Sequence, residues 1–422
     1  MNIFNTLLDP IPIPKMVRAR QTYPRPVSSD PEAEFLDKLH RSGVLSRVKS
    51  GMSIAITVGS RGVSNQPLLV RALVAELKKL GASPFIIPAM GSHGGATAPG
   101  QQEMLEGMGV SAAAMGAPIR ATMETVVLGE AAPGLPAQID KFAHEADGII
   151  IINRIKPHSS FRGPYESGLA KMITIGLGKQ RGAEACHRLG FGKMAENIPL
   201  IAKKVIAEAN ILFGIGLLEN AYHETARIEV IPTADILDRE PALQEESKQL
   251  CARLAFDQLD VLIMDEIGKD ISGTGFDTNI VGRYHTPFIS GGPRITRVAV
   301  LDITARSHGN GNGLGIVDMT TRRAYKKFSF EKTYPNALTS TVPLSVMIPM
   351  VLENDRHAIQ AAIRTSNVFD QSQVRLMRIK NTNEMDEVEI STSLMKEAAD
   401  SPFIEIISEP YPLSFDTNGN LF

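Results

Sequence analysis

The feature that most constrains the fold is a run of four isoleucines at residues 149–152, followed closely by a lysine-proline pair and a histidine. A β-branched apolar run without polar alternation is typical of a strand that is covered on both faces, as in a parallel sheet. The strand must end by Pro157, because proline has no N–H for the ladder and holds the preceding residue extended. His158 therefore follows the carboxyl end of a buried strand, where open α/β sheets bind their ligands.

A strand-helix-strand unit lies earlier in the chain. Residues 52–58 and 84–88 are apolar and short, as buried strands are, and residues 66–80 between them carry apolar side chains at helical spacing. A helix that joins two strands indicates a parallel pair with a right-handed crossover. The sequence therefore predicts an α/β fold built on a parallel sheet.

Glycine-rich turns follow both strands of this unit, GSRG at residues 59–62 and GSHGG at residues 91–95. Because parallel neighbours end at the same edge of a sheet, we expect Arg61 and His93 to lie near each other, with His158 beside them if its strand joins the sheet. Turns of this kind that lead into helices can present backbone amides to an anion, although glycine can equally serve only to make the turn tight. The residues of such a cradle would be Gly59, Ser60, Ser92, Gly94 and Gly95.

The common nucleotide-binding motifs do not occur at these turns. Neither turn is followed by the Gly-Lys-Ser/Thr of a Walker loop, and no GxGxxG sequence opens a helix after the first strand. A standard NAD site is therefore weakly supported.

The length of 422 residues is too great for one compact core, so two domains are expected. A helix at residues 195–209 and a strand at 211–217 extend the first α/β domain, which we predict to span residues 1–258. Strand-like runs and further glycine-rich loops predict a smaller α/β domain over residues 259–399. The tail, residues 400–422, contains a strand-like stretch that we expect to return to the first domain.

Composition narrows the class of protein. Hydrophobic residues make up 43% and charged residues 21%, which is ordinary for a soluble globular protein, and the net charge of −2 gives no electrostatic footprint for nucleic acid. The apolar runs are too short to span a membrane, and the first residues do not resemble a signal peptide. Two cysteines cannot form a disulfide framework, so a cytoplasmic location is expected.

The stretch from residue 149 to residue 192 is rich in groups that can do chemistry. His158 and the earlier His93 each follow a buried strand, and two imidazoles in one cleft suit acid–base catalysis. Lys171 could be a surface charge, a phosphate binder or a covalent attachment point. His187 could bind a metal, although no HExxH or CxxC motif supports a conventional zinc site. Cys186 is better interpreted as a small buried thiol than as a soft ligand.

The sequences GSHGG, KPHSSFRGPYESGLAKM and ACH resemble those of the lactate racemase family, the nickel-pincer-nucleotide-dependent 2-hydroxyacid racemases and epimerases. The resemblance implies a Rossmann-like N-terminal domain, a smaller C-terminal α/β domain and an active site in the cleft between them. It implies a pyridinium-3,5-bisthiocarboxylic acid mononucleotide nickel complex, attached to Lys171 and with its nickel bound by His187. It also implies that His93 and His158 are the acid–base catalysts and that Arg61 binds the substrate carboxylate.

This implied chemistry has a physical rationale. Hydride loss from a 2-hydroxy acid gives a planar 2-keto acid that is open on both faces, provided that a base takes the hydroxyl proton. One histidine on each face then serves both enantiomers, while the cofactor carries the hydride. The small-molecule acid would be the substrate, and the enzymes that make the cofactor in the host would be the partners.

The second domain departs from the family pattern. The family's tyrosine, glutamine and lysine after a Lys-Asp-Ile sequence are absent here, and the chain has no tryptophan to cover the substrate. We therefore expect a 2-hydroxy acid other than lactate, with Thr274, Asn279 and Arg283 as candidate contacts. Two alternatives stay open: an NAD-dependent oxidoreductase, and a non-catalytic homologue that binds a nucleotide or metabolite.

Overall fold

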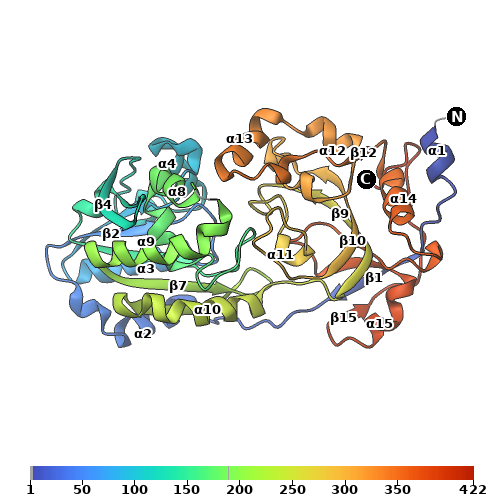
Figure 1. The fold of residues 1–422 in the computed structure, drawn as a ribbon. Helices are drawn as coiled ribbons and strands as arrows, with labels where there is room; N and C mark the ends of the chain where they lie inside the picture. The colour runs from blue at the N-terminus through green and yellow to red at the C-terminus, as the bar shows by residue number, and fades with distance from the viewer. Residues whose placement is uncertain (1–2, 189) are drawn as a thin grey trace. The chain divides into compact units, whose positions relative to one another are not determined.

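The computed structural model describes residues 3–188 and 190–422, which form two compact units. The N-terminal unit is Pro24–Ala252. The C-terminal unit combines the described residues up to Tyr23 with Arg253–Phe422. The ribbon in Figure 1 carries the labels of the helices and strands that are used below.

A five-stranded sheet is the centre of the N-terminal unit. Its order is β3 (Ser83–Pro88), β2 (Ser53–Val58), β6 (Gly148–Arg154), β7 (Ile211–Glu219) and β8 (Thr225–Pro232). The first four strands are parallel, with Ile56 of β2 opposite Ile86 of β3 and Ile150 of β6, and β8 runs antiparallel to β7. The predicted α/β fold with a parallel sheet is confirmed.

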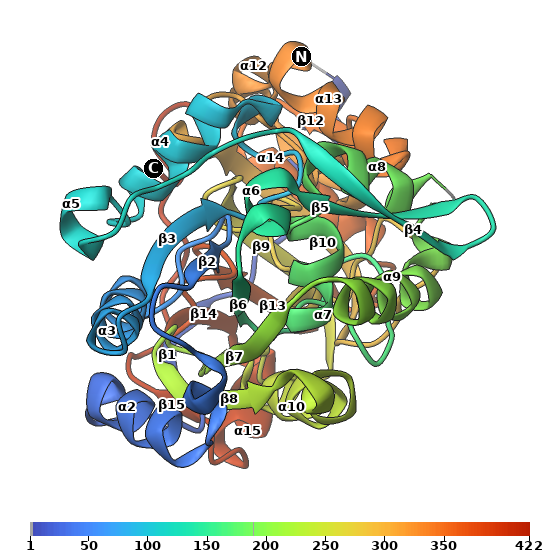
Figure 2. The ribbon, with the colours of Figure 1, turned by 90° about the vertical axis from the view of Figure 1, so that its left-hand side faces the viewer.

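Helices cover both faces of this sheet (Figure 2). Helices α2 (Pro31–Arg41) and α3 (Gln66–Lys79) lie on one face, where Phe35 and Leu73 belong to the same buried cluster as Ile56. Helices α7 (Leu169–Lys171) and α10 (Ile236–Leu250) lie on the other face, against β7. The long apolar run of β6 thus serves a strand with two covered faces, as predicted from its isoleucines.

The remaining elements of the N-terminal unit lie around this three-layer core. A separate hairpin joins β4 (Thr125–Ala132) to β5 (Leu135–Asp140), and α9 (Met194–Glu208) packs against both strands. The other α-helices are α4 (Ala98–Gly107), α5 (Ala112–Met115), α6 (Lys141–Glu145) and α8 (Lys179–His187).

The C-terminal unit contains an eight-stranded mixed sheet. Its order is β12 (Met350–Leu352), β11 (Met319–Thr321), β10 (Arg294–Ile303), β9 (Gln258–Ile267), β13 (Leu376–Ile379), β14 (Glu387–Ser391), β1 (Met16–Gln21) and β15 (Ile404–Ile406). The first five strands are parallel, and the last three alternate in direction. Helix α14 (Asp355–Thr365) buries Ile359 and Ile363 against Val261 and Ile263 of β9. The other α-helices are α1 (Ile3–Leu8), α11 (Thr278–Val281), α12 (Arg322–Lys327), α13 (Phe330–Ser340) and α15 (Met395–Ala399).

The ends of the chain lie in a different unit from the one that the sequence indicated. Strand β1 pairs with β14 on one side and β15 on the other, with Val17 opposite Ile390 and Ala19 opposite Ile406. The segment before Tyr23 and the tail therefore belong to the C-terminal unit, whereas we had expected both in the first domain. The reason is that antiparallel pairing between residues more than 360 positions apart leaves no local pattern in either segment.

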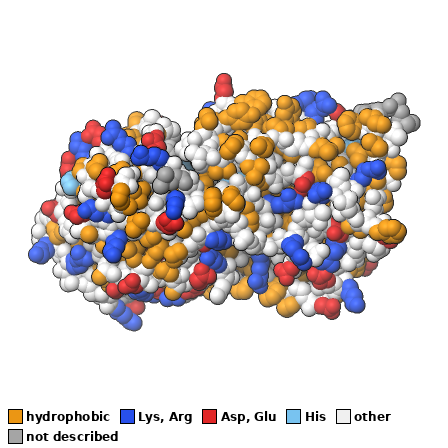
Figure 3. All heavy atoms as spheres, in the orientation of Figure 1, with side chains coloured by type: hydrophobic (Ala, Val, Ile, Leu, Met, Phe, Trp, Pro, Cys, Tyr) orange, Lys and Arg blue, Asp and Glu red, His pale blue; other side chains and the backbone are white. Residues whose placement is uncertain are grey.

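Two observations concern the surface. Basic and acidic side chains are interspersed over the face that Figure 3 draws. Among the described residues, no helix combines the length and the apolar character that crossing a membrane requires.

Candidate active site

Three predicted site residues follow three adjacent strands of the N-terminal sheet. Arg61 comes after β2, His93 after β3 and His158 after β6, and these strands are parallel neighbours in the order β3-β2-β6. Their carboxyl ends share one edge of the sheet, the position where α/β sheets bind ligands. The prediction that the three turns meet at one edge is confirmed.

The segment that carries Lys171 packs against two of these turns. Lys171 ends the short helix α7, and a π-helical turn, Met172–Gly176, follows it directly. A Cβ on Gly59 would lie 3.2 Å from Met172 Cε, and the Gly91 N–H donates to the Gly176 carbonyl over 3.3 Å. The turns after β2 and β3 thus approach the residues that follow Lys171 closely.

Lys171 is a half-buried amine with unusual acidity. Its pKa is lowered to about 8, chiefly by burial; Cys186 opposes this shift, and the positive charges of Lys156 and Arg61 add to it. An ordinary lysine is almost wholly protonated near neutral pH, whereas this one presents a useful fraction of free amine. The side chain is therefore suited to form a covalent bond.

His187, the last residue of α8, is held in one tautomer. Its Nδ1–H donates to the Ala183 carbonyl over 2.7 Å, because a carbonyl oxygen can only accept. Burial lowers the pKa of His187, and the nearby Lys171 lowers it too. A neutral ring with Nδ1–H on a backbone carbonyl and its lone pair on Nε2 is the usual arrangement of a metal-binding histidine.

Cys186, next to His187 in the sequence, is not suited to bind a metal. Its thiol is buried against the Met194 sulfur, 3.6 Å away, and burial raises its pKa to about 12. Only the thiolate is a strong metal ligand, so a protonated thiol here agrees with its interpretation as a packing residue.

His158 lies beside His187 across one aromatic ring. The His158 ring centroid is 6.0 Å from that of Phe191 and 4.5 Å from that of Phe161, and Phe191 meets the His187 ring edge-on at 5.7 Å. The Ser160 N–H donates to His158 Nδ1 over 3.0 Å. In the neutral ring this bond places the proton on Nε2.

The backbone of His158 is held by Glu166, a residue that our sequence reasoning did not single out. The Glu166 side chain is fully buried, and its Oε2 accepts from the His158 N–H over 2.8 Å. Arg162, at 3.2 Å, and Lys248, at 3.0 Å, balance its charge. The sequence gives no sign that Glu166 holds His158. Its partner Lys248 comes from α10, far along the chain, and its bond to His158 is to the main chain.

His93 has the opposite tautomer to His158. Its Nδ1–H donates to the Met90 carbonyl over 2.7 Å, so the lone pair of the neutral ring is on Nε2. The neighbouring Arg61 turn is tied to β7, because Glu219 accepts from the Ser64 N–H over 2.7 Å and forms an ion pair with Arg154. Burial and the Arg154 charge lower the pKa of Arg61, which still remains a cation near neutral pH.

The glycine turns do not themselves open α-helices, although Gly94–Ala96 form a short 3-10 turn. Helix α3 begins at Gln66 and α4 at Ala98, several residues beyond each turn. Gly94 and Gly95 adopt left-handed backbone angles, with φ of 64° and 65°, and a Cβ on Gly94 would lie 2.6 Å from the Gln101 nitrogen. Glycine at position 94 thus permits a close approach to α4, and the cofactor role of these turns stays a prediction.

The three candidate substrate residues lie in the C-terminal unit. Thr274 is buried, and its hydroxyl donates to the Phe276 carbonyl over 2.7 Å. Asn279 lies in the first turn of α11, where its N–H donates to Asp277 Oδ1 over 2.9 Å. Arg283 pairs with Asp318 at 2.9 Å and donates to the Ile295 carbonyl at the amino end of β10. Their substrate contacts stay predictions, and the Arg283 guanidinium has a structural task as well.

A buried carboxyl, Glu240 on α10, supports the helix of Lys171. Glu240 accepts from the Ala170 N–H over 2.8 Å, and burial raises its pKa to about 8. A Cβ on Gly168 would lie 2.2 Å from Glu240 Oε1, so only glycine fits above the carboxyl. Glu240 therefore holds the start of the helix that ends at Lys171.

Glu240 is expected to make stability depend on pH. Its folded-state pKa is above its ordinary value of 4.5, so its contribution is fully present below pH 4.5 and is lost as the pH rises through about 8. Urea titrations at several values from pH 4.5 to pH 8 give the free energy of unfolding at each pH. This free energy should fall more for the wild type than for Glu240→Gln. The two slopes against pH should differ by an amount that corresponds to at most about one proton. If the free energies of unfolding of the two proteins change in parallel with pH, Glu240 is not protonated in the folded state.

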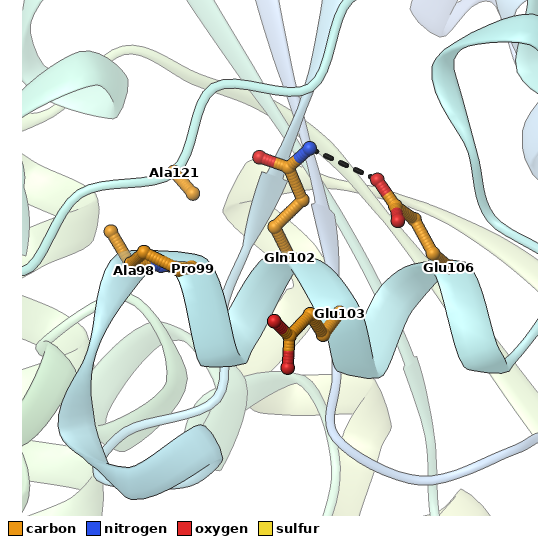
Figure 4. A pocket seen from close by; sticks show the side chains of 6 residues that line it. All are labelled: Ala98, Pro99, Gln102, Glu103, Glu106 and Ala121. Atoms are coloured by element: carbon orange, nitrogen blue, oxygen red, sulfur yellow. Dashed lines mark hydrogen bonds between the residues drawn. The ribbon is translucent and has the colours of Figure 1, made fainter.

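A hollow on the outer side of α4 is separate from these residues. It has a volume of about 400 Å³ and is lined by Ala98, Pro99, Gln102, Glu103, Glu106 and Ala121 (Figure 4). It contains none of the predicted site residues. The described residues also include no cluster of three or more His, Cys, Asp or Glu side chains that would hold a metal by themselves.

Comparison with known proteins agrees with this architecture. Residues 14–216 match the family described as lactate racemase N-terminal domain. The structure of the lactate racemase apoprotein from Thermoanaerobacterium thermosaccharolyticum has a similar fold, with a TM-score of 0.52 and 13% sequence identity over 86% of this chain and 94% of that one. No curated protein sequence matches the chain. The chain is thus similar to the lactate racemase N-terminal domain over residues 14–216, and it shares its fold with a lactate racemase apoprotein.

Proposed function

We propose that the protein is a racemase or epimerase of a 2-hydroxy acid that uses a nickel-pincer nucleotide bound by Lys171 and His187. The observation that carries the proposal is the pairing of these two residues. A lysine with a pKa of about 8 acts electrostatically on a neutral histidine whose Nε2 carries the lone pair. Both lie in the unit that carries Arg61, His93 and His158 at one sheet edge.

The residues present fit this cofactor. The Lys171 amine would form the covalent link and His187 Nε2 would bind the nickel, while the turns with Gly59, Ser60, Ser92, Gly94 and Gly95 would surround the nucleotide. His187 would be the one protein ligand of the nickel, because the cofactor itself would supply the other donor atoms. When bound, this group supplies a reversible acceptor for the substrate hydride.

The protein's own side chains would bind the substrate and move its hydroxyl proton. Arg61 offers a fork of N–H donors that matches a carboxylate. His93 Nε2 can accept the hydroxyl proton, and His158 carries a proton on Nε2 that it can donate to a substrate oxygen. The two imidazoles thus begin in complementary protonation states, as an acid–base pair requires.

The substrate is expected to be a 2-hydroxy acid other than lactate, because the family's second-domain tyrosine, glutamine and lysine are missing. Thr274, Asn279 and Arg283 remain the proposed contacts in the C-terminal unit. A panel that compares lactate with longer, dicarboxylic and sugar acids, followed by chiral chromatography, tests this. Fast turnover of lactate would contradict it.

The test of the function uses protein made in a host that synthesises the cofactor. We expect an intact mass increased by one mononucleotide and interconversion of the two configurations of a 2-hydroxy acid. Consumption of added NAD with the same acids, followed by absorbance, would favour an oxidoreductase. A protein without adduct or turnover would favour a binding protein.

His187→Ala should lose nickel and keep the organic adduct. The imidazole binds only the metal in this proposal, whereas the link to the protein is through Lys171. Elemental analysis should give about one nickel per wild-type chain and a large loss in the variant, while the intact mass still includes the mononucleotide. His144→Ala, which changes an exposed histidine on α6, is the matched control and should retain nickel. Equal nickel in both variants would exclude His187 as the ligand.

A further inference from the structure

A fully buried ion pair lies beside the His93 turn. Lys179 is the first residue of α8, has a left-handed φ of 54° and points its ammonium at Asp140 Oδ2, 2.9 Å away. Both side chains are 0% exposed. The ammonium also donates to the carbonyl of Pro88, which ends β3, and to Gln101 Oε1 over 3.3 Å. The ammonium therefore has one carboxylate as its ion-pair partner and donates hydrogen bonds to two further oxygens.

Gln101 on α4 connects this ammonium to the turn. Its side-chain nitrogen donates to the Gly91 carbonyl over 2.9 Å and to the His93 carbonyl over 3.2 Å. An ammonium can only donate, so it requires the amide oxygen of Gln101 to face it and turns the NH₂ group toward the main-chain carbonyls. The orientation of the Gln101 amide follows from the charge of Lys179.

Side chains donate hydrogen bonds to four main-chain carbonyls at the end of β3 and in the turn that follows it. Lys179 donates to the Pro88 carbonyl, and the His93 ring donates to the Met90 carbonyl. Gln101 donates to the carbonyls of Gly91 and His93. The Met90 and His93 carbonyls also accept from the main-chain N–H groups of His93 and Ala96, both over 3.2 Å, in a turn that bends through Gly91 with a left-handed φ of 58°. Lys179 and Gln101, which come from other helices, add side-chain donors at the Pro88, Gly91 and His93 carbonyls and so help to fix the turn that aims the His93 ring.

Stability alone does not account for a buried pair of charges here. Replacing such a pair by well-packed apolar residues is often neutral or stabilising, because desolvation costs offset the attraction. Apolar residues of the same volume would fill the space between β3 and α8. They would leave the Pro88 carbonyl without the Lys179 donor and Gln101 without the charge that orients its amide, which are the tasks that this ammonium performs.

We propose that Gln101, oriented by Lys179, is a positioning residue that holds the His93 turn so that His93 keeps its proton on Nδ1 and its Nε2 lone pair toward the substrate. The proposal deepens the acid–base role given to His93 above and rests on it for its effect on turnover. Its structural part, the tautomer of His93, can be measured in protein that carries no cofactor.

The experiment compares Gln101→Glu with the wild type. Glutamate keeps an acceptor for Lys179 and removes both donors to the turn. Gln102→Glu is the matched control, because the neighbouring Gln102 is exposed and donates to Glu106 over 3.0 Å (Figure 4). Long-range ¹H–¹⁵N spectra of the histidine rings identify the tautomer of His93, and His187 serves as an internal reference for the fold, since its Nδ1–H bond to Ala183 does not involve Gln101.

We expect His93 to be an Nδ1–H tautomer in the wild type and in Gln102→Glu, and to shift toward Nε2–H in Gln101→Glu while His187 stays unchanged. In the loaded enzyme, kcat should fall by on the order of 10²-fold with KM within about twofold, as for a misplaced catalytic group. If the glutamate variant loses the His187 reference signal, Gln101→Met, which is neutral and of similar length, is measured in its place.

An Nδ1–H tautomer and unchanged kcat in the folded Gln101 variant would overturn the proposal. The positioning role of Gln101 and the proposed racemase function can be contradicted independently of each other. A shifted tautomer in a protein that turns over no hydroxy acid would support the positioning role of Gln101 and contradict the proposed function instead.

Discussion

Lys171→Ala is expected to give a folded protein that carries no covalent mononucleotide and has no measurable turnover. The amine is the proposed attachment point, and its pKa of about 8 reflects burial together with the charges of Lys156 and Arg61. No other described lysine combines such a shift with a place beside the candidate metal ligand His187. The loss should be complete, because the link to the protein is a single bond. Intact mass spectrometry of protein from a cofactor-producing host measures it directly.

The control for this prediction is Lys193→Ala, which changes an exposed lysine paired with Glu196 on the protein surface. It should keep the full adduct mass. The attachment should also depend on pH in a defined direction. Because the pKa is lowered, the reactive free amine increases as pH rises through about 8, two or more units below the range of an ordinary lysine. An adduct that persists in Lys171→Ala would place the link elsewhere and remove the basis of the proposed function.

His93→Asn is expected to lower kcat by about 10²- to 10⁴-fold in both directions of the reaction, the usual contribution of a general base. Asparagine can still donate from its amide to the Met90 carbonyl, as the His93 Nδ1–H does over 2.7 Å, but it has no basic nitrogen at the position of Nε2. The turn should therefore keep its shape while the proton acceptor is lost. Rates from each enantiomer, measured by chiral chromatography, give the two values.

The same loss is expected for His158→Ala, since each cycle needs a group on either face of the planar intermediate. His144→Asn, a change at an exposed position on α6, should leave both rates unaltered. Retention of full activity by His93→Asn would assign the proton transfer to another group. A loss in one direction only would show that the two histidines do not serve the same substrate oxygen.

The sequence predicted the parts of the fold that depend on local periodicity. The isoleucine run of β6, the unit from β2 to β3 and the helix α9 all have apolar spacings that their burial explains. Strand β8 was not among the strands that the sequence predicted. The β4 strand was missed because its side chains are only partly buried and do not alternate.

The candidate site was predictable to the extent that it follows from topology. Parallel strands must end at one edge, so Arg61, His93 and His158 were expected together. Glu166, Gln101 and Glu240 were not, because each acts on backbone groups that only the folded chain brings within reach. Their residue types are common at the surface, and only burial shows that they have other tasks.

The pairing of β1 between β14 and β15 has a consequence for biosynthesis. Strand β1 is translated before the N-terminal unit and its partners β14 and β15 after it, while Pro24–Ala252 has all five strands of its own sheet in continuous sequence. The nascent chain can therefore complete the lysine-bearing unit before β14 and β15 are translated, whereas the other unit closes only once both have been made.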